Sequence, residues 1–478
     1  MALGGAVGGA MLFRTSAPGL AGPNAPVHIH SADHHGPAVL GGSSASATPF
    51  SVQLPVPSVL RPTDSRGGVD FYRVPIRPAN VQIIPGLDTP ALTYGGQFVG
   101  PTIRAKEGRR VKVEYRNQLG MPANVHLHGG HVSPDNDGHP MDLVEPGTAR
   151  VYSYPNRQRG ATLWYHDHSH HMEAEHVYRG LHGFYLIEGE DEKRLRLPDG
   201  PYDVPIMLRE ARIDESGELI FSPFDFERPM ILANGRLQPY LRVAARKYRL
   251  RLLNASTHRV LQLDLGGAEM VQIASDGGLL PTPVPRTELV LGPAERAEVV
   301  VDFSRHPIGS QLVLSNSNMQ GPVLRFDVVR RVADHSRVPD ELTRLPPLPV
   351  ATNTREVTLS TDFVNIRSLI DGKEFDATRV DARIREGSSE IWHVRNVDTD
   401  FGGVNHTFHL HLVQFRVLDR DGNPPWPGES GFKDTVFIPP GQSVRVQATF
   451  RGFTGRYVYH CHMLEHSAFG MMAQMEIV

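Results

Sequence analysis

The sequence predicts an all-β protein composed of three Greek-key β-sandwiches. Short segments rich in strand-forming residues recur along the chain, and 46 Gly and 39 Pro residues supply turn signals between them. From residue 49 onward, sustained helical periodicity is almost absent. A chain of 478 residues is also too long for one compact core, and such a length indicates about three domains.

Four segments show the strand pattern most clearly. Residues 111–115 alternate apolar and polar side chains, the pattern of a half-buried strand. Residues 298–303, 443–450 and 456–462 are rich in strand-forming residues. Turn dipeptides such as Asn-Gly and Asp-Gly recur between strand-like segments. This spacing favours β-sandwiches over an alternation of strands and helices.

Two charged stretches divide the chain into three segments. Residues 188–201 are charged and end in a turn sequence, whereas residues 330–349 are rich in charge and proline without a strand pattern. We therefore predict sandwiches over residues 48–192, 198–328 and 350–478. Each segment has a suitable size for one Greek-key sandwich.

The first 47 residues differ from the rest in composition. They are rich in Gly, Ala, Ser and Pro, which predicts an unstructured tail. Residues 2–13 are apolar, too few to span a bilayer but enough for the core of a signal peptide. A secretion signal that has lost its basic start and a disordered tail are equal alternatives, and the first would place the protein in the periplasm or outside the cell. We predict no membrane span.

Charge excludes one class of partner. The formal net charge is −3, and charged residues make up 21% of the chain. A nearly neutral protein has no basic field to attract nucleic acid or anionic lipid. We therefore expect no nucleic-acid partner.

Histidine is the unusual residue, with 24 copies against a single cysteine. Chance alone predicts about one His-x-His triplet in such a chain. On a strand, side chains at i and i+2 point to the same face, so each triplet presents two imidazoles to one point. The triplets are His28/His30, His126/His128, His166/His168, His168/His170, His409/His411 and His460/His462. We interpret His28/His30 as part of a solvated tail, with a metal-capturing arm as the alternative.

The C-terminal motif is the most specific. It reads His460, Cys461, His462, then His466 and Met471. On a strand Cys461 faces away from both neighbouring histidines, so one strand can serve two metal sites. Two imidazoles, a thiolate and a weak axial thioether form the electron-transfer site that selects copper. His406 supplies the second imidazole, so the set comprises His406, Cys461, His466 and Met471. The alternative, a buried core cysteine beside a filler methionine, explains either residue alone but not the whole set.

The other histidines of the paired motifs suggest a second site. They are His126, His128, His166, His168, His409, His411, His460 and His462. Eight imidazoles without a carboxylate can ligate three coppers. Zinc sites use three or four ligands each and often include Glu or Asp, so copper fits better.

These motifs resemble those of the three-domain multicopper oxidases, the family of laccases, ascorbate oxidase and bacterial copper-efflux and spore-coat oxidases. The resemblance covers roughly residues 50–478. It rests on His-Leu-His-Gly-Gly at 126–130, Trp-Tyr-His-Asp-His at 164–168, His-Thr-Phe-His-Leu-His at 406–411 and the block at 460–472. It implies three cupredoxin-like domains, the middle one free of copper, and dioxygen as the electron acceptor.

The resemblance also implies a role for each ligand among four coppers. The type 1 copper, where electrons enter, would be held by His406, Cys461, His466 and axial Met471. The type 2 copper would be held by His126 and His409. The type 3 pair would be held by His128, His166, His168, His411, His460 and His462. No expected ligand is missing, which disfavours a non-catalytic copper-binding or structural relative. Length and the presence of all four motifs disfavour a two-domain nitrite reductase.

Proton delivery is less completely indicated. Asp137 matches the acid that lies near the type 2 copper in related bacterial enzymes, and it could relay protons; the alternative is a simple turn residue. Many relatives carry a second acid directly after the last type 1 histidine, where this chain has Ser467. With Asp137, we expect Cys461 and His466 to serve catalysis, because they form the electron entry.

Two substrate classes remain open. One is a phenol, aminophenol or related organic molecule; the other is a cuprous or ferrous ion oxidised in metal detoxification. The copper-efflux branch carries a methionine-rich insertion over its type 1 site, whereas this chain has 13 methionines and no such run in its last third. We therefore favour an organic substrate.

Overall fold

The computed structural model describes residues 45–223, 227–319 and 321–478. Strands account for 48% of the structure and helices for 7%, which confirms the all-β prediction. The tail predicted before residue 48 lies outside the described residues up to position 44, as does the His28/His30 pair.

The first two sheets come from the N-terminal part of the chain. One has the order β2 (Thr89–Tyr94), β1 (Val69–Val81), β4 (Arg110–Asn117), β6 (Ala149–Tyr154). The other has the order β3 (Gly100–Lys106), β8 (His182–Glu188), β7 (Ala161–His166), β5 (His126–His128). Between them lies a buried cluster that includes Tyr115, Tyr152 and Tyr165.

The next two sheets form the middle sandwich. The larger has the order β11 (Arg236–Leu237), β10 (Met230–Ala233), β9 (Asp203–Ala211), β13 (Lys247–Asn254), β18 (Arg296–Asp302), β15 (Met270–Ser275), β16 (Gly278–Arg286). The smaller has the order β12 (Tyr240–Ala245), β20 (Gly321–Arg331), β19 (Gln311–Asn316), β14 (Leu261–Asp264), β17 (Glu288–Leu291). Their facing sides share an aliphatic core that includes Leu250, Leu252 and Val299.

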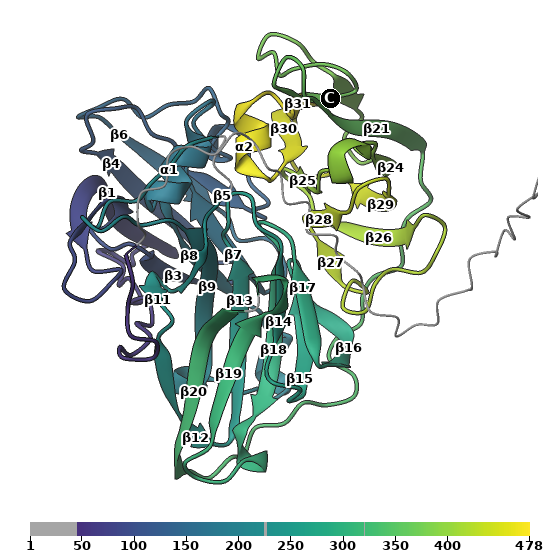
Figure 1. Cartoon of the computed structure of the whole chain (residues 1–478). Helices are drawn as coiled ribbons and strands as arrows, with labels where there is room; N and C mark the ends of the chain where they lie inside the picture. The colour runs from purple at the N-terminus through teal and green to yellow at the C-terminus, as the bar shows by residue number, and fades with distance from the viewer. Residues whose placement is uncertain (1–44, 224–226, 320) are drawn as a thin grey trace, which may run out of the picture. The chain divides into compact units, whose positions relative to one another are not determined.

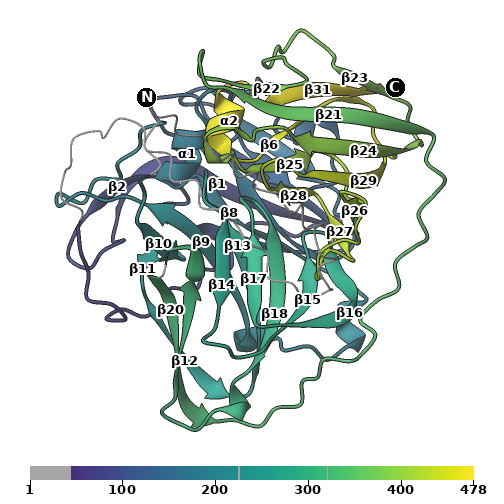
Figure 2. The same cartoon turned by 45° about the vertical axis from the view of Figure 1, so that its right-hand side comes forward.

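The last two sheets come from the C-terminal part. One has the order β22 (Arg367–Ile370), β21 (Asn353–Asp362), β24 (Ser389–Asn396), β29 (Ser443–Thr449), β26 (Phe415–Arg420), β27 (Phe432–Lys433). The other has the order β23 (Ala382–Ile384), β31 (Met472–Ile477), β30 (Gly455–Cys461), β25 (His406–Leu410), β28 (Thr435–Ile438). Strands β25, β28 and β31 of this last sheet lie together in both views (Figures 1 and 2).

The same topology recurs in all three pairs of sheets. Within the described residues each sheet contains one parallel pair, such as β1 with β4, β13 with β9 and β21 with β24. A chain that crosses from one sheet of a sandwich to the other and back makes such parallel neighbours, as expected of Greek-key connections. The domain boundaries at 48–192, 198–328 and 350–478 stay predictions.

The four segments predicted as strands are confirmed. They correspond to β4, β18, β29 and β30. Two short α-helices were not expected, α1 (Glu173–Arg179) and α2 (Leu464–Ala468). Single-turn 3₁₀ helices cover Pro134–Asn136, Glu192–Arg194, Gly200–Tyr202, Phe303–Arg305, Ser317–Met319 and Asp400–Gly402.

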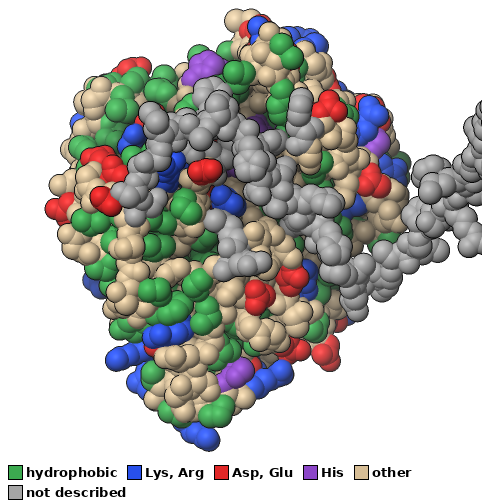
Figure 3. Space-filling model, in the orientation of Figure 1, with side chains coloured by type: hydrophobic (Ala, Val, Ile, Leu, Met, Phe, Trp, Pro, Cys, Tyr) green, Lys and Arg blue, Asp and Glu red, His purple; other side chains and the backbone are tan. Residues whose placement is uncertain are grey.

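The surface carries both signs of charge. On the face drawn in Figure 3, acidic and basic side chains are interspersed rather than gathered by sign. Among the described residues, no helix has the length and apolar character needed to cross a bilayer.

Candidate metal centre

Two pairs of antiparallel strands carry the histidine motifs. In the first pair of sheets, β5 pairs with β7 so that His126 lies opposite His166. In the last pair, β25 pairs with β30 so that His409 lies opposite His460. Because alternate residues share a face, each register places its imidazoles on one side of the strands. Histidines as far apart in sequence as His168 and His460, separated by 292 positions, thereby reach one buried region.

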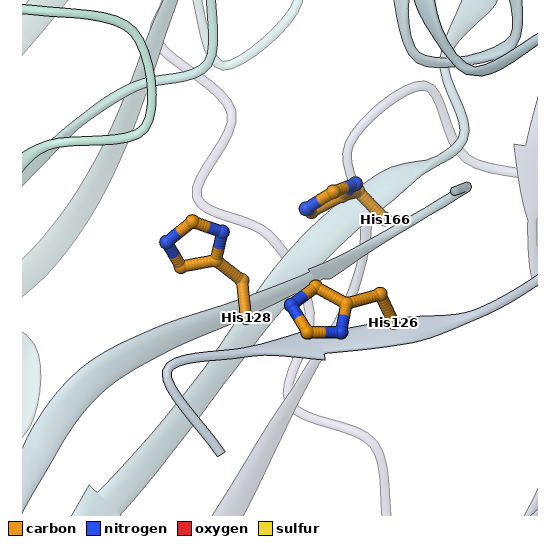
Figure 4. Close-up of side chains that lie close together, drawn as sticks. All are labelled: His126, His128 and His166. Atoms are coloured by element: carbon orange, nitrogen blue, oxygen red, sulfur yellow. The ribbon is translucent and has the colours of Figure 1, made fainter. Parts of the chain in front are cut away.

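The imidazole rings of this region are in close contact. The Nε2 atoms of His168 and His460 lie 3.1 Å apart, and those of His411 and His460 lie 3.2 Å apart. His166 and His462 approach to 3.4 Å between their Nε2 atoms. Figure 4 shows the rings of His126, His128 and His166 converging from neighbouring strands, and one nitrogen of each lies within 4.8 Å of one nitrogen of the other two. We call these eight residues the histidine cluster: His126, His128, His166, His168, His409, His411, His460 and His462.

The electrostatics of the histidine cluster keep the rings neutral. Burial, reinforced by the neighbouring imidazoles, lowers the pKa of His126, His128 and His168 well below the usual value. Burial likewise lowers the pKa of His166 and of His460 to about 4. A neutral imidazole keeps the lone pair that a metal ion requires.

Several of these rings have a nitrogen that forms no hydrogen bond among the described residues. The atoms are His126 Nε2, His128 Nδ1, His168 Nδ1, His409 Nε2 and His462 Nδ1. A buried polar atom without a partner carries a free-energy penalty of roughly 1–3 kcal/mol. Metal ions that accept these lone pairs would remove the penalty at all five nitrogens. The residues therefore fit a multinuclear copper site.

A second group lies on the other side of strand β30. Cys461 Sγ is 3.5 Å from His406 Nδ1 and 3.6 Å from His466 Nδ1, and the two nitrogens are 3.1 Å apart. Met471 is buried beside them: its carbonyl oxygen accepts the Cys461 N–H and its own N–H donates to the His466 carbonyl oxygen. We call His406, Cys461, His466 and Met471 the cysteine site.

The alternation predicted for residues 460–462 is confirmed. His460 contacts His168 and His411 in the histidine cluster, whereas Cys461 contacts His406 and His466. Burial alone would lower the pKa of His406, but Cys461 and Asp398 raise it to about 9. The cysteine site thus stabilises a positive charge, which a bound metal ion would carry in place of the His406 proton.

Asp137 lies against the histidine cluster, as the sequence suggested. Its carboxylate Oδ2 is 2.7 Å from His411 Nδ1, and its backbone carbonyl oxygen is 2.6 Å from His126 Nδ1. Burial raises the pKa of Asp137 well above its usual value, and the nearby Asp142 adds to the effect. The geometry fits both a proton donor and a residue that orients the two rings.

Sequence reasoning missed the acids that orient the other rings. Asp434 Oδ1 is 2.9 Å from His128 Nε2, and Asp398 Oδ2 is 2.9 Å from His406 Nε2. One oxygen of Asp434 lies within 4.8 Å of one nitrogen each of His128 and His409, so the region is not made of imidazoles alone. Both of its oxygens accept hydrogen bonds from Arg296, at 2.6 Å each, which indicates an orienting role. No periodicity or motif marks either acid.

Replacing Arg296 with leucine should destabilise the protein strongly. Arg296 and Asp434 are both buried, and Asp276 lies 3.7 Å from the same guanidinium. Removal leaves a buried carboxylate without its cation, which lowers the free energy of unfolding by about 3–5 kcal/mol. Denaturant unfolding measures the loss. The control is Arg325→Leu, because the Arg325–Asp327 pair is partly exposed and should lose no more than about 1 kcal/mol. Equal losses in the two variants would contradict this account.

Comparison with known proteins agrees with the site. Three family models, each described as multicopper oxidase, match residues 76–192, 164–322 and 343–478. A laccase of Bacillus subtilis (strain 168) is 35% identical over 90% of this chain and 98% of its own. Bilirubin oxidase of Albifimbria verrucaria is 34% identical over 89% of this chain and 80% of its own. The crystal structure of a multi-copper oxidase from Pediococcus acidilactici superposes with a TM-score of 0.86 at 32% identity, covering 93% of this chain and 95% of that one.

One assignment follows from the family matches along the chain and from the relatives that cover most of its length. The side chains of the site suit copper, as this assignment requires. The fold is that of cupredoxin-like sandwiches, and the cofactor is copper at type 1, type 2 and type 3 sites. The chain belongs to the multicopper oxidase family, and it is a laccase-like oxidoreductase that uses oxygen.

Proposed function

We propose that this oxidase couples the one-electron oxidation of phenolic or aminophenolic substrates to the four-electron reduction of dioxygen to water. The observation that carries the proposal is a cavity lined by aromatic rings and carboxylates, which opens beside the helix that carries His466 of the cysteine site. We assign His406, Cys461, His466 and Met471 to the type 1 copper, and the histidine cluster to the other coppers as its motifs predict. Bound copper supplies one-electron redox chemistry and the binding of dioxygen.

The exposure of His466 supports its role as the point of electron entry. Its relative exposure is 7%, against 0% for His406, Cys461 and His460. His466 is therefore the residue of the cysteine site most open to solvent. The peptide link from Cys461 to His460 and His462 gives a short covalent path from that site to the histidine cluster. The chain's own contribution is to hold these groups dry and at fixed separation.

A cavity of about 600 Å³ opens beside helix α2, which carries His466. Its lining comprises His170, His171, Ala174, Glu175, Phe221, Pro223, Ile366, Glu374, Phe375, Glu465, Ala468, Phe469 and Gly470. The three phenylalanines offer ring contacts to an aromatic substrate. The carboxylates can accept the proton that a phenol or aminophenol loses on oxidation. Among the residues that the structure describes, this lining includes no methionine, the soft ligand that would favour a cuprous ion.

Oxygen uptake by the copper-loaded protein tests the substrate class. We expect dimethoxyphenol and an aminophenol to give higher kcat/KM than Cu(I) or Fe(II), with bilirubin included as a larger organic substrate. Phe375→Ala should raise KM for the phenol roughly 2- to 10-fold, because an aromatic contact contributes about 0.5–1.5 kcal/mol. The matched control is Phe453→Ala, which removes a ring that contacts His131 and is absent from the cavity lining. Faster turnover of the metal ions would move the function to a metallo-oxidase of metal detoxification.

Location outside the cytoplasm is also a proposal. It is supported only by the apolar stretch at residues 2–13, which lies outside the described residues. Fractionation of cells that express the full chain tests it, and recovery in the cytoplasm alone would exclude it.

A further inference from the structure

A buried carboxyl group lies where the two short helices meet. Helix α1 follows strand β7, which ends at His166, and helix α2 follows strand β30, which ends at Cys461. The helices lie side by side in both views (Figures 1 and 2) and share the apolar contact of Ala174, Val177 and Leu464. At this contact Glu173 of α1 faces Ser467 of α2, and both are fully buried.

One hydrogen bond joins these residues. The Ser467 hydroxyl donates to Glu173 Oε1 at 3.0 Å. Glu173 Oε2 has no hydrogen-bond partner among the described residues. Since Oε1 accepts a hydrogen bond, a proton held by this carboxyl group sits on Oε2, the oxygen that is free to pass it on.

The charges around Glu173 favour its neutral form. Among the described residues it forms no ion pair, because the nearby His176 pairs with Asp167 at 3.1 Å and Glu465 of α2 pairs with Arg228 at 2.6 Å. Burial raises the pKa of Glu173 to about 8, and Asp167 adds to this, while Ser467 and His176 oppose it. Glu175, the other acid of α1, pairs with Arg179. The carboxyl group is therefore protonated at neutral pH.

Glu173 adjoins residues of the cavity lining and a residue next to the histidine cluster. Its neighbours in sequence, Ala174 and Glu175, line the cavity, as does Ala468, the residue after Ser467. On the inner side, the Glu173 N–H donates to the carbonyl oxygen of Ser169, the residue after His168. Asp137 contacts the cluster at His126 and His411 instead, so the two acids lie beside different histidines.

We propose that Glu173 is a proton-relay residue that conducts protons from the cavity to the histidine cluster across the α1–α2 contact. The proposal rests on the oxygen-reducing function given above. Each dioxygen consumes four electrons, taken from substrate, and four protons to form two waters. In each relay step the O–H bond at Oε2 breaks and the proton moves inward. The carboxylate then takes a proton from cavity water, so an O–H bond of that water breaks as the new O–H bond at Oε2 forms, and the water regains the proton that the oxidised phenol or aminophenol releases. Ser467 orients the group by occupying Oε1.

Infrared spectroscopy of the copper-loaded oxidised enzyme tests whether Glu173 holds a proton. We expect a protonated carboxylic acid band at pH 6–7 that titrates near the pKa of about 8. Glu173→Gln should remove this band, whereas Glu175→Gln should keep it. Ser467→Ala removes a donor that stabilises the carboxylate, so the band should persist to higher pH. A Glu173 carboxylate already ionised at pH 6 would overturn the proposal, and this readout is independent of turnover.

Kinetics test whether the proton is used. General acid catalysis contributes about 10²–10⁴-fold to a reaction rate. Water can replace part of the proton transfer in Glu173→Gln, so we expect kcat to fall by at least about 10-fold. In the parent, kcat should fall as the pH rises through about 8, where Glu173 ionises. This fall should be absent from the pH profile of Glu173→Gln. The solvent isotope effect on kcat should rise, while KM for the phenol and the anaerobic bleaching of the blue site should not change.

A double variant distinguishes a proton-relay role of Glu173 from a purely structural one. Glu173→Gln combined with Ser467→Glu places a carboxyl group at the other end of the same contact, and it should recover much of the lost kcat. A parent-like kcat and pH profile in Glu173→Gln would overturn the relay and leave the oxidase function intact. Absence of oxygen uptake by the copper-loaded parent with every donor would instead overturn the proposed function.

Discussion

Cys461→Ser should abolish both the blue colour and the oxidase activity. The thiolate lies within 3.6 Å of the His406 and His466 nitrogens, and thiolate ligation gives the blue copper site its colour. Serine supplies a harder oxygen that binds copper weakly there, so electrons no longer enter the chain. We expect turnover below about 1% of the parent, equivalent to more than ~2.7 kcal/mol of lost transition-state stabilisation.

The test combines visible absorption, copper content and oxygen uptake. Cys461 is fully buried and similar in size to serine, so the fold should survive and the histidine cluster should keep its copper. The matched control is Met471→Leu, which alters only the weak axial ligand. It should keep the colour and most of the activity while shifting the reduction potential. Parent-rate oxidation by Cys461→Ser would show that electrons do not enter through Cys461.

Asp137→Asn should lower kcat without removing the blue colour. The carboxylate contacts His411 directly and the backbone of Asp137 contacts His126, so the group lies where protons are consumed. Asparagine keeps the size and can hydrogen-bond, but it cannot release a proton. Loss of a general acid predicts a decrease in kcat of about 10²-fold or more.

Stopped-flow reduction without oxygen separates this effect from electron entry. Substrate should bleach the blue site of Asp137→Asn at the parent rate, while steady-state oxygen uptake falls. Asp135→Asn is the control, because Asp135 is an exposed acid two positions before Asp137. If Asp137→Asn keeps both the kcat and the pH profile of the parent, Asp137 only orients His411 and His126.

Local sequence was informative wherever the chemistry depends on strand periodicity. The two-residue repeat of a strand places His126 and His128 on one face and turns Cys461 away from His460, and both arrangements occur in the structure. Strand-forming residues and turn dipeptides predicted the all-β class for the same reason, because they act over a few residues.

Contacts between distant segments could not be read in this way. Asp434 and Arg296 meet across 138 positions, and Glu173 and Ser467 meet across 294. No repeat links such residues. Their proximity follows from the order of strands in the sheets and from the packing of α1 on α2, which close only when the whole chain has folded. The ligand types were therefore evident from short motifs. The acids that orient the rings and hold protons became visible only once folding had buried them beside the metal centre, where desolvation alters their pKa values.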